Sequence, residues 1–160
     1  NKKELTEIII NKLKEKYKIS REEINEMTAE KSIPATIFSS KLGALESLTK
    51  YMKENLNMSY HEIAKLLSRN DRTIWTSYKK SKEKQKEQIK EKEPSAFLPI
   101  SIFKDRNLTV LESLILYLKE KKIKNKEIAR LIERDQRNIS TIYSRAIKKI
   151  KGKVYKHNIS

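Results

Sequence analysis

The sequence predicts an all-α protein assembled from repeated helical units. Apolar residues recur at the three- and four-residue spacing of helices rather than in alternation. The 160 residues include only two glycines and three prolines, so few positions favour the tight turns of β-hairpins. Because only 37% of the residues are hydrophobic, any core must be small and local, which favours compact helical units.

The chain contains an internal repeat, since the pattern of residues 62–78 reappears in residues 127–143, 65 positions later. Each copy begins with Glu-Ile-Ala-x-Leu, passes through a run of polar residues and ends in Ile-x-x-x-Tyr. The spacing of the apolar residues predicts a short helix, a tight turn and a second helix in each copy.

The repeat extends upstream of this motif. Residues 33–38 match residues 98–103 at the same offset, and each predicts a short helix anchored by its phenylalanine. The next helix is expected near residues 45–51 and 111–117, an offset of 66, because the second copy gains one residue before this helix and loses one after Glu120. Insertions confined to connections favour two folded repeats.

The N-terminal segment predicts a helix over residues 4–16. Its apolar residues share one face: Leu5, Ile8, Ile9 and Leu13. Ser20 followed by a glutamate three residues later is a capping-box signature, so a second helix is expected to start there and to carry Ile24 and Met27 inward. This segment resembles the first part of the later units but lacks their final helix. We interpret it as a degenerate third copy that serves in packing or in homodimerisation.

A charged linker connects the two full units and ends at Pro94. It combines charges of both signs with strong helix formers and no glycine, which predicts a solvated helical spacer of about 22 Å at 1.5 Å per residue. A flexible linker is the alternative. Gly152 is a natural helix stop, so the residues after it are expected to form a loose basic tail.

These observations predict five parts in the chain. They are an N-terminal helical segment (1–31), a first helix-turn-helix domain (32–80), a charged linker (81–96), a second helix-turn-helix domain (97–151) and a basic tail (152–160).

A formal net charge of +16 predicts attraction to polyanions, of which nucleic acid is the commonest. Ile- and Lys-rich composition also arises in AT-rich genomes and hot environments, so the charge alone does not decide. The absence of cysteine excludes disulfides and thiolate metal sites. No apolar run approaches the roughly 20 residues that span a bilayer and no secretory signal is present, so we expect a cytoplasmic, nucleoid-associated protein.

Helical spacing separates the scaffold of each repeat from its surface. Ile74 and Tyr78, like Ile139 and Tyr143, lie four residues apart on a buried face. The residues around them point outward and are candidates for contact with DNA: Arg72, Thr73, Trp75, Thr76, Lys79 and Lys80 in the first unit, and Gln136, Arg137, Asn138, Ser140, Thr141, Ser144 and Arg145 in the second.

The repeated motif resembles the helix-turn-helix of the fourth conserved region of bacterial sigma factors and of LuxR-type regulators. In that family the second helix reads the major groove, and by position this implicates two sets of residues: Asp71, Arg72, Thr73, Trp75 and Thr76, and Gln136, Arg137, Asn138, Ser140 and Thr141. Ser68-Arg69 and Glu133-Arg134 stand where the family has glycine and an aliphatic residue. Since nothing resembles the sigma-factor regions that bind polymerase and melt promoters, only groove reading is implied.

The chemistry of these side chains suits a duplex. Arginine can donate two hydrogen bonds to guanine, and Asn or Gln can pair bidentately with adenine, so Gln136 and Asn138 make the second unit the better adenine reader. A lone tryptophan is commonly a core residue, but the counterpart of Trp75 is Ser140, which favours an exposed indole. A further set is expected to bind phosphates: Lys79, Lys80, Ser144, Arg145, Lys148 and Lys149.

The predicted function is therefore a double-stranded DNA-binding transcriptional regulator with two heads that read an asymmetric, bipartite site. An architectural protein with little sequence preference and a protein-docking module are the alternatives. No enzyme, cofactor, metal site or small-molecule ligand is predicted. Asp71 and Asp135 are interpreted as helix N-caps, and His61 and His157 as solvated.

Overall fold

The computed structural model describes residues 1–17, 31–39, 41–92 and 96–159, and it divides the chain into two compact units, residues 1–31 and 32–160. The first unit contains α1 (Lys2–Tyr17), which confirms the first predicted helix. Three of its apolar side chains are exposed: Leu5, Ile8 and Ile9. The side chain of Leu13 and the helix predicted from Ser20, with Ile24 and Met27, lie outside the described residues.

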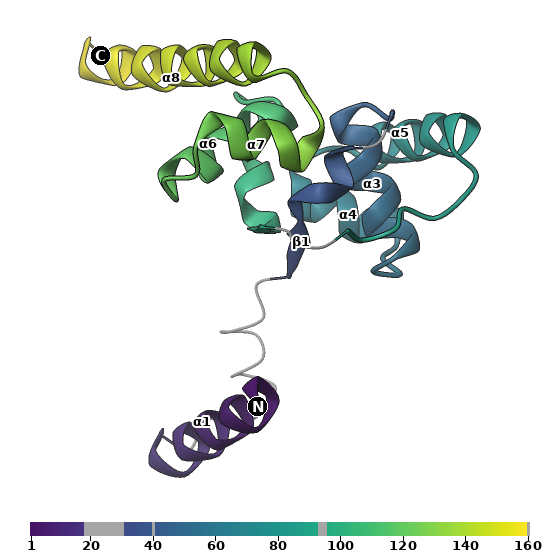
Figure 1. Ribbon diagram of the computed structural model, residues 1–160, viewed down its shortest axis with the longest axis vertical. Helices are drawn as coiled ribbons and strands as arrows, with labels where there is room; N and C mark the ends of the chain where they lie inside the picture. The colour runs from purple at the N-terminus through teal and green to yellow at the C-terminus, as the bar shows by residue number, and fades with distance from the viewer. Residues whose placement is uncertain (18–30, 40, 93–95, 160) are drawn as a thin grey trace. The chain divides into compact units, whose positions relative to one another are not determined.

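The second unit contains the same order of elements twice (Figure 1). The first half consists of β1 (Ser32–Pro34), η1 (Ala35–Ser39), α3 (Ala44–Glu54), α4 (Tyr60–Leu67) and α5 (Asp71–Lys84). The second half consists of β2 (Phe97–Pro99), η2 (Ile100–Lys104), α6 (Val110–Glu120), α7 (Asn125–Ile132) and α8 (Gln136–Ile159). The one-residue changes predicted on either side of the first helix of each repeat are confirmed. The chain is mostly helical, as predicted, but the sequence did not predict the strands.

Local hydrogen bonds set the starts of several helices. At α4, Ser59 Oγ accepts from the Glu62 N–H and the Glu62 carboxylate accepts from the Ser59 N–H. Thr109 and Glu112 form the same reciprocal pair at α6. α3 instead begins after Gly43, which provides no side-chain cap. Since such a cap contributes about 1 kcal/mol, the first half begins its first helix with less local stabilisation than the second.

The connection between the halves is not the helical spacer that the sequence predicted. α5 ends before residues 85–92, which contain no helix. In this stretch Ile89 is buried and its carbonyl accepts a hydrogen bond from Asn55 Nδ2 at 3.1 Å, while the Tyr51 hydroxyl donates to the Glu91 carboxylate. A short solvated helix gains little without tertiary packing, whereas the chain that folds back onto α3 buries an isoleucine. The prediction was wrong because these contacts outweigh helix propensity.

The last helix also departs from the prediction. α8 continues through Gly152 to Ile159, so the expectation that Gly152 stops the helix was wrong. A glycine C-cap requires a positive φ, and among the described residues no glycine adopts one. A Cβ built on Gly152 would meet nothing within 4 Å. Gly152 is thus an ordinary interior position of α8, where it costs about 0.5–1 kcal/mol relative to alanine.

The two strands join the halves. β1 and β2 are antiparallel, and Ile33 lies opposite Leu98, its counterpart 65 residues later. Phe38 and Phe103 are also counterparts, both are buried, and their ring centroids lie 6.0 Å apart. A three-residue strand has no periodicity of its own and its partner is distant in the sequence, which is why the sequence did not reveal it.

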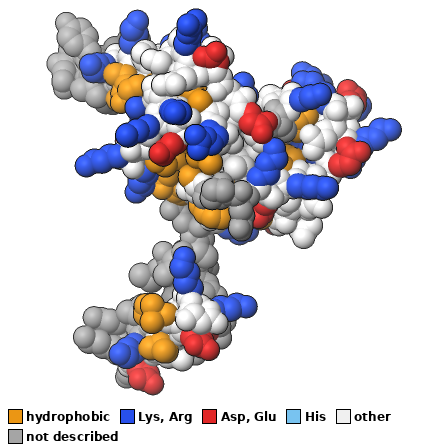
Figure 2. All heavy atoms as spheres, in the orientation of Figure 1, with side chains coloured by type: hydrophobic (Ala, Val, Ile, Leu, Met, Phe, Trp, Pro, Cys, Tyr) orange, Lys and Arg blue, Asp and Glu red, His pale blue; other side chains and the backbone are white. Residues whose placement is uncertain are grey.

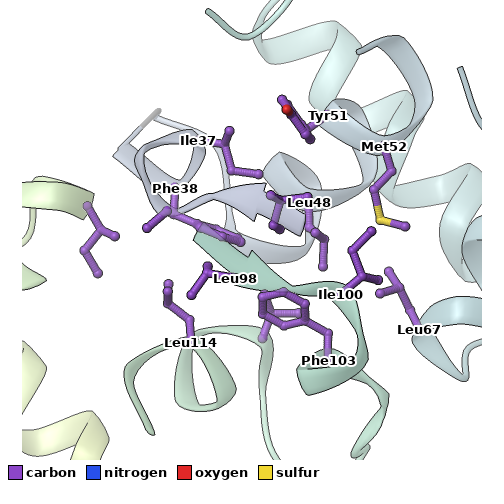
Figure 3. Packing of buried hydrophobic residues seen from close by; sticks show 14 of the residues in the cluster. Ile37, Phe38, Leu48, Tyr51, Met52, Leu67, Leu98, Ile100, Phe103 and Leu114 are labelled. Carbon is purple, nitrogen blue, oxygen red and sulfur yellow. The ribbon is translucent and has the colours of Figure 1, made fainter. Parts of the chain in front are cut away.

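Both halves contribute to one hydrophobic core around this strand pair. Figure 3 shows Phe38 and Leu48 of the first half beside Leu98, Phe103 and Leu114 of the second. η1 packs against α7 and η2 packs against α4, so each half packs its short helix onto the other half. The segments expected as two domains, 32–80 and 97–151, therefore lie in one compact unit.

Candidate nucleic-acid interface

Each half presents two helices joined by a three-residue turn, α4 with α5 and α7 with α8. Ser68 and Glu133 open these turns in the left-handed region, with φ of 52° and 50°. In both turns the next residue, an arginine, donates its backbone N–H to the carbonyl of the alanine five residues earlier, at 2.9 and 3.0 Å. This closes the helix end as a Schellman motif does, at a cost of about 1 kcal/mol for each non-glycine residue with positive φ.

Arg69 is the second residue of the turn between α4 and α5. It is half-buried, and its Nη1 donates to the carbonyl oxygens of Leu67 at 3.1 Å and of Phe103 at 3.4 Å. Burial, with a further contribution from the nearby Arg106, lowers the pKa of the Arg69 guanidinium. The turn of the first half thus contacts η2 of the second half through a charged side chain.

The second helices begin at side-chain caps. Asn70 Oδ1 accepts from the Thr73 N–H at 2.7 Å, so Asn70 caps α5 and the prediction that Asp71 does so was wrong. Asp71 is instead the first residue of the helix, and its carboxylate lies 3.3 Å from His61 Nδ1. Asp135 caps α8 as predicted, since it accepts from the Arg137 N–H at 2.7 Å. The two caps are counterparts, 65 residues apart.

The inner faces of α5 and α8 are as predicted. Ile74 and Ile139 are fully buried. Tyr78 and Tyr143 are half-buried, and the Tyr78 hydroxyl donates to Glu54 at 3.3 Å. Burial, reinforced by Glu54, raises the pKa of Tyr78. Because these residues fix the rotation of each helix, the polar residues beside them face outward, except Ser77, which is buried.

The outer face of α5 brings most of the first predicted set together. Arg72 is exposed, and Thr76, half-buried, donates its hydroxyl to the Arg72 carbonyl at 2.8 Å. Trp75 is 47% exposed, which confirms the exposed indole, and Lys79 Nζ lies 5.0 Å from the centre of its ring. Other predicted residues lie on the same helix: Asp71 and Lys80, both exposed, and Thr73, half-buried.

The outer face of α8 repeats this arrangement. The predicted base-contact residues are all exposed: Gln136, Arg137, Asn138, Ser140 and Thr141. So are the predicted phosphate-contact residues: Ser144, Arg145, Lys148 and Lys149. Thr141 donates to the Arg137 carbonyl at 3.0 Å, as Thr76 does to that of Arg72. Within the described part of the chain, neither arginine guanidinium forms an ion pair.

One predicted phosphate contact also has a structural partner. Lys149 Nζ lies 2.6 Å from the carboxylate of Glu112, and the counterpart Lys84 lies 2.8 Å from that of Glu46. Burial opposes ionisation of Glu112, but hydrogen bonds from Lys149 and Thr109 outweigh it, so its pKa is lowered. These ion pairs join α5 to α3 and α8 to α6, and Lys149 remains 44% exposed.

Two hollows border these faces. The first, of about 590 Å³, lies between the start of α3 and the outer face of α5, and is lined by residues that include Arg72, Thr76 and Lys80. The second, of about 360 Å³, lies between the starts of α3 and α6, and its lining includes Arg69, Arg106 and Lys149. Helix starts carry a partial positive charge, so both hollows favour an anion.

Lysine and arginine side chains are spread widely over the visible face of the second unit in Figure 2, with few acidic side chains between them. Residues that the sequence reasoning missed add to this charge, above all Arg69 and Arg106. Arg69 could have been identified from the sequence, because it recurs as Arg134 at the 65-residue offset of the repeat. Arg106 lies in the connection that the second copy lengthened, so comparison of the copies could not reveal it.

Over the described ranges, no helix is long and apolar enough to cross a bilayer, and no cluster of three or more His, Asp or Glu residues is placed to hold a metal ion. Comparison of the chain with protein-family models, with curated proteins and with solved structures found no match.

Proposed function

We propose that this protein binds double-stranded DNA through two helix-turn-helix heads, α4–α5 and α7–α8, and acts as a transcriptional regulator. One observation carries the proposal. Both second helices present the same outward row at four-residue spacing, an arginine, a threonine and a basic residue: Arg72, Thr76 and Lys80, and Arg137, Thr141 and Arg145. Such a row on the second helix of a pair fits the width of a major groove.

The roles within each head follow from geometry and chemistry. Arg72 and Arg137 are free to pair bidentately with guanine, a contact worth about 1–3 kcal/mol of discrimination. The hydroxyls of Thr76 and Thr141 donate hydrogen bonds to the backbone carbonyls of Arg72 and Arg137, so their methyl groups remain available to contact a thymine methyl. The heads differ at three of the predicted base-contact positions, so we propose an asymmetric site: Asp71 and Gln136, Thr73 and Asn138, Trp75 and Ser140.

The remaining basic residues contribute affinity without selectivity. Lys79, Lys80, Arg145 and Lys148 are exposed on the same helices, with Ser144 between them, and would contact phosphates. Each phosphate that is neutralised adds about one unit to the salt dependence of log K.

Titration of a labelled duplex pool tests the proposal. The double variant Arg72→Ala with Arg137→Ala should lose sequence-selective binding by roughly 10-fold or more, as expected for about 1–3 kcal/mol from each arginine. A matched control is Lys65→Ala with Arg130→Ala, which also removes two positive charges at counterpart positions, here from exposed sites on α4 and α7. Equal losses in both variants would exclude groove reading and leave only general attraction.

The net charge of +16 supports a second candidate, an architectural DNA-binding protein with little sequence preference. Selection from a random duplex pool separates the two. A recovered motif supports the regulator, whereas uniform protection with a steep salt slope supports the architectural role.

A homodimer through the N-terminal segment stays a prediction. The exposed Leu5, Ile8 and Ile9 of α1 support it. Sedimentation equilibrium of the full chain, compared with an Ile8→Asp variant, tests it.

A further inference from the structure

The pairing of β1 with β2 relates the two halves by a local two-fold axis. Ile33 pairs with its own counterpart, Leu98. Ser32 pairs with Pro99, the counterpart of Pro34, and Pro34 pairs with Phe97, the counterpart of Ser32. In two-fold symmetry, if residue i of one half pairs with residue j of the other, the counterpart of i also pairs with the counterpart of j, and the three β1–β2 pairs meet this condition.

The packing around the strands obeys the same relation. η1 packs against α7 while η2 packs against α4, and these two contacts exchange under the symmetry. α3 packs against its counterpart α6, and the ring of Phe38 lies tilted beside that of its counterpart Phe103. Two halves related by translation, as in a string of repeats, would not bring counterparts together. The two-fold relation therefore extends from the strands to the helices.

The surface next to this axis is shared by both heads. The hollow beside α5 and the hollow between the starts of α3 and α6 have Ala44 and Leu45 in common, and the second hollow also includes Lys149 of α8. A continuous surface thus runs from the outer face of α5, past the starts of α3 and α6, to α8. Arg69 and Arg106 line the second hollow, where they would attract a phosphate backbone.

We infer that the DNA site of this protein is an inverted repeat, whose two half-sites are read in opposite directions, with the centre of the site over the starts of α3 and α6, where Ala44 and Leu45 lie near their counterparts Val110 and Leu111. The inference rests on the proposed function and adds the orientation of the half-sites. A two-fold axis of a protein that coincides with that of the duplex presents equivalent helices to opposite strands, which is why two-fold symmetric proteins select palindromic sites. Two heads related by translation would select a direct repeat.

The chain offers a decisive test because the two heads differ at only three of the predicted base-contact positions, Asp71/Gln136, Thr73/Asn138 and Trp75/Ser140. The variant Gln136→Asp with Asn138→Thr and Ser140→Trp gives the second head the predicted base-contact side chains of the first, since Arg137 and Thr141 already match Arg72 and Thr76. The substituted residues are exposed, so the fold is retained, and far-UV circular dichroism checks it. The variant and the original chain are each used to select from a random-sequence duplex pool long enough for two half-sites.

The selected sequences distinguish the outcomes. The expected result is a motif of two related halves for the original chain and a perfect palindrome for the variant. A perfect direct repeat, or a single half-site in both selections, would overturn the inference while the DNA-binding proposal stands. Retention of no duplex, or retention without any enriched sequence, would overturn the proposal of sequence reading and the inference with it.

Discussion

Replacement of Phe103 by alanine should destabilise both halves of the second unit together. Phe103 lies in the second half, is only 1% exposed and contacts the ring of Phe38 in the first half. Truncation of a buried phenylalanine costs about 3–5 kcal/mol, which includes the transfer of the ring and the cavity that it leaves. At a denaturant slope of roughly 1–3 kcal/mol/M in urea, the unfolding midpoint should fall by about 1–5 M.

The assay uses two probes of urea unfolding. Trp75 is the single tryptophan of the chain and reports on the first half, whereas far-UV circular dichroism reports on all helices. If the halves share one core, both probes should shift together in Phe103→Ala, although the substitution lies in the half without the tryptophan. Phe97→Ala is the matched control, because Phe97 is 61% exposed and its loss should change stability by less than about 0.5 kcal/mol.

An unchanged tryptophan midpoint, beside a circular dichroism transition that splits in two, would refute the shared core. The halves would then be independent domains, and the two-fold relation inferred from the strands would have no energetic basis.

Three further predictions follow from particular contacts. Asn70→Ala should lower stability by about 0.5–2 kcal/mol in thermal unfolding while Asp71→Ala should have little effect, since Asn70 caps α5; the reverse order would contradict the assigned cap. Ile89→Ala should cost about 2–4 kcal/mol in urea, because Ile89 is buried in the hydrophobic core, whereas a solvated linker would show no cost. The pKa of Glu112 is lower in the folded state than its ordinary value of 4.5, because of the pair with Lys149. The stability from this pair is therefore complete above pH 4.5 and is lost as the pH falls through the folded pKa. Glu112→Gln should remove this part of the acid dependence of stability, which pH-jump unfolding measures.

The sequence predicted those features that depend on neighbours along the chain. Apolar spacing placed the helices of both halves, and comparison of the copies placed the one-residue changes in the connections. The same comparison separated buried Ile74 and Ile139 from the exposed positions beside them. It also predicted the exposure of Trp75, because Ser140 at the equivalent position would make a poor core residue. These predictions succeeded because the buried face of an amphipathic helix can be recognised from the spacing of its own apolar residues.

The features that the sequence did not predict depend on distant residues. The pairing of Ile33 with Leu98 joins short segments that carry no periodicity. Residues 85–92 have the composition of a helix, and only the hydrogen bond from Asn55 and the burial of Ile89 explain why they fold back. Likewise, the partner of Lys149 is Glu112 on another helix, which charge patterning along α8 could not indicate.

The folded-back connection changes what sets the distance between the two heads. A helical spacer would have made that distance depend on the length of the linker. In the structure the halves are held by β1 and β2, by Phe38 against Phe103, and by each short helix on the opposite half. The packing of this core resists deformation, whereas the connection runs over its surface. The geometry of the two helix pairs, α4–α5 and α7–α8, is therefore a property of the core. If the proposed function holds, the residues that pack in the core, and not the charged segment between the repeats, would set the spacing of the DNA half-sites.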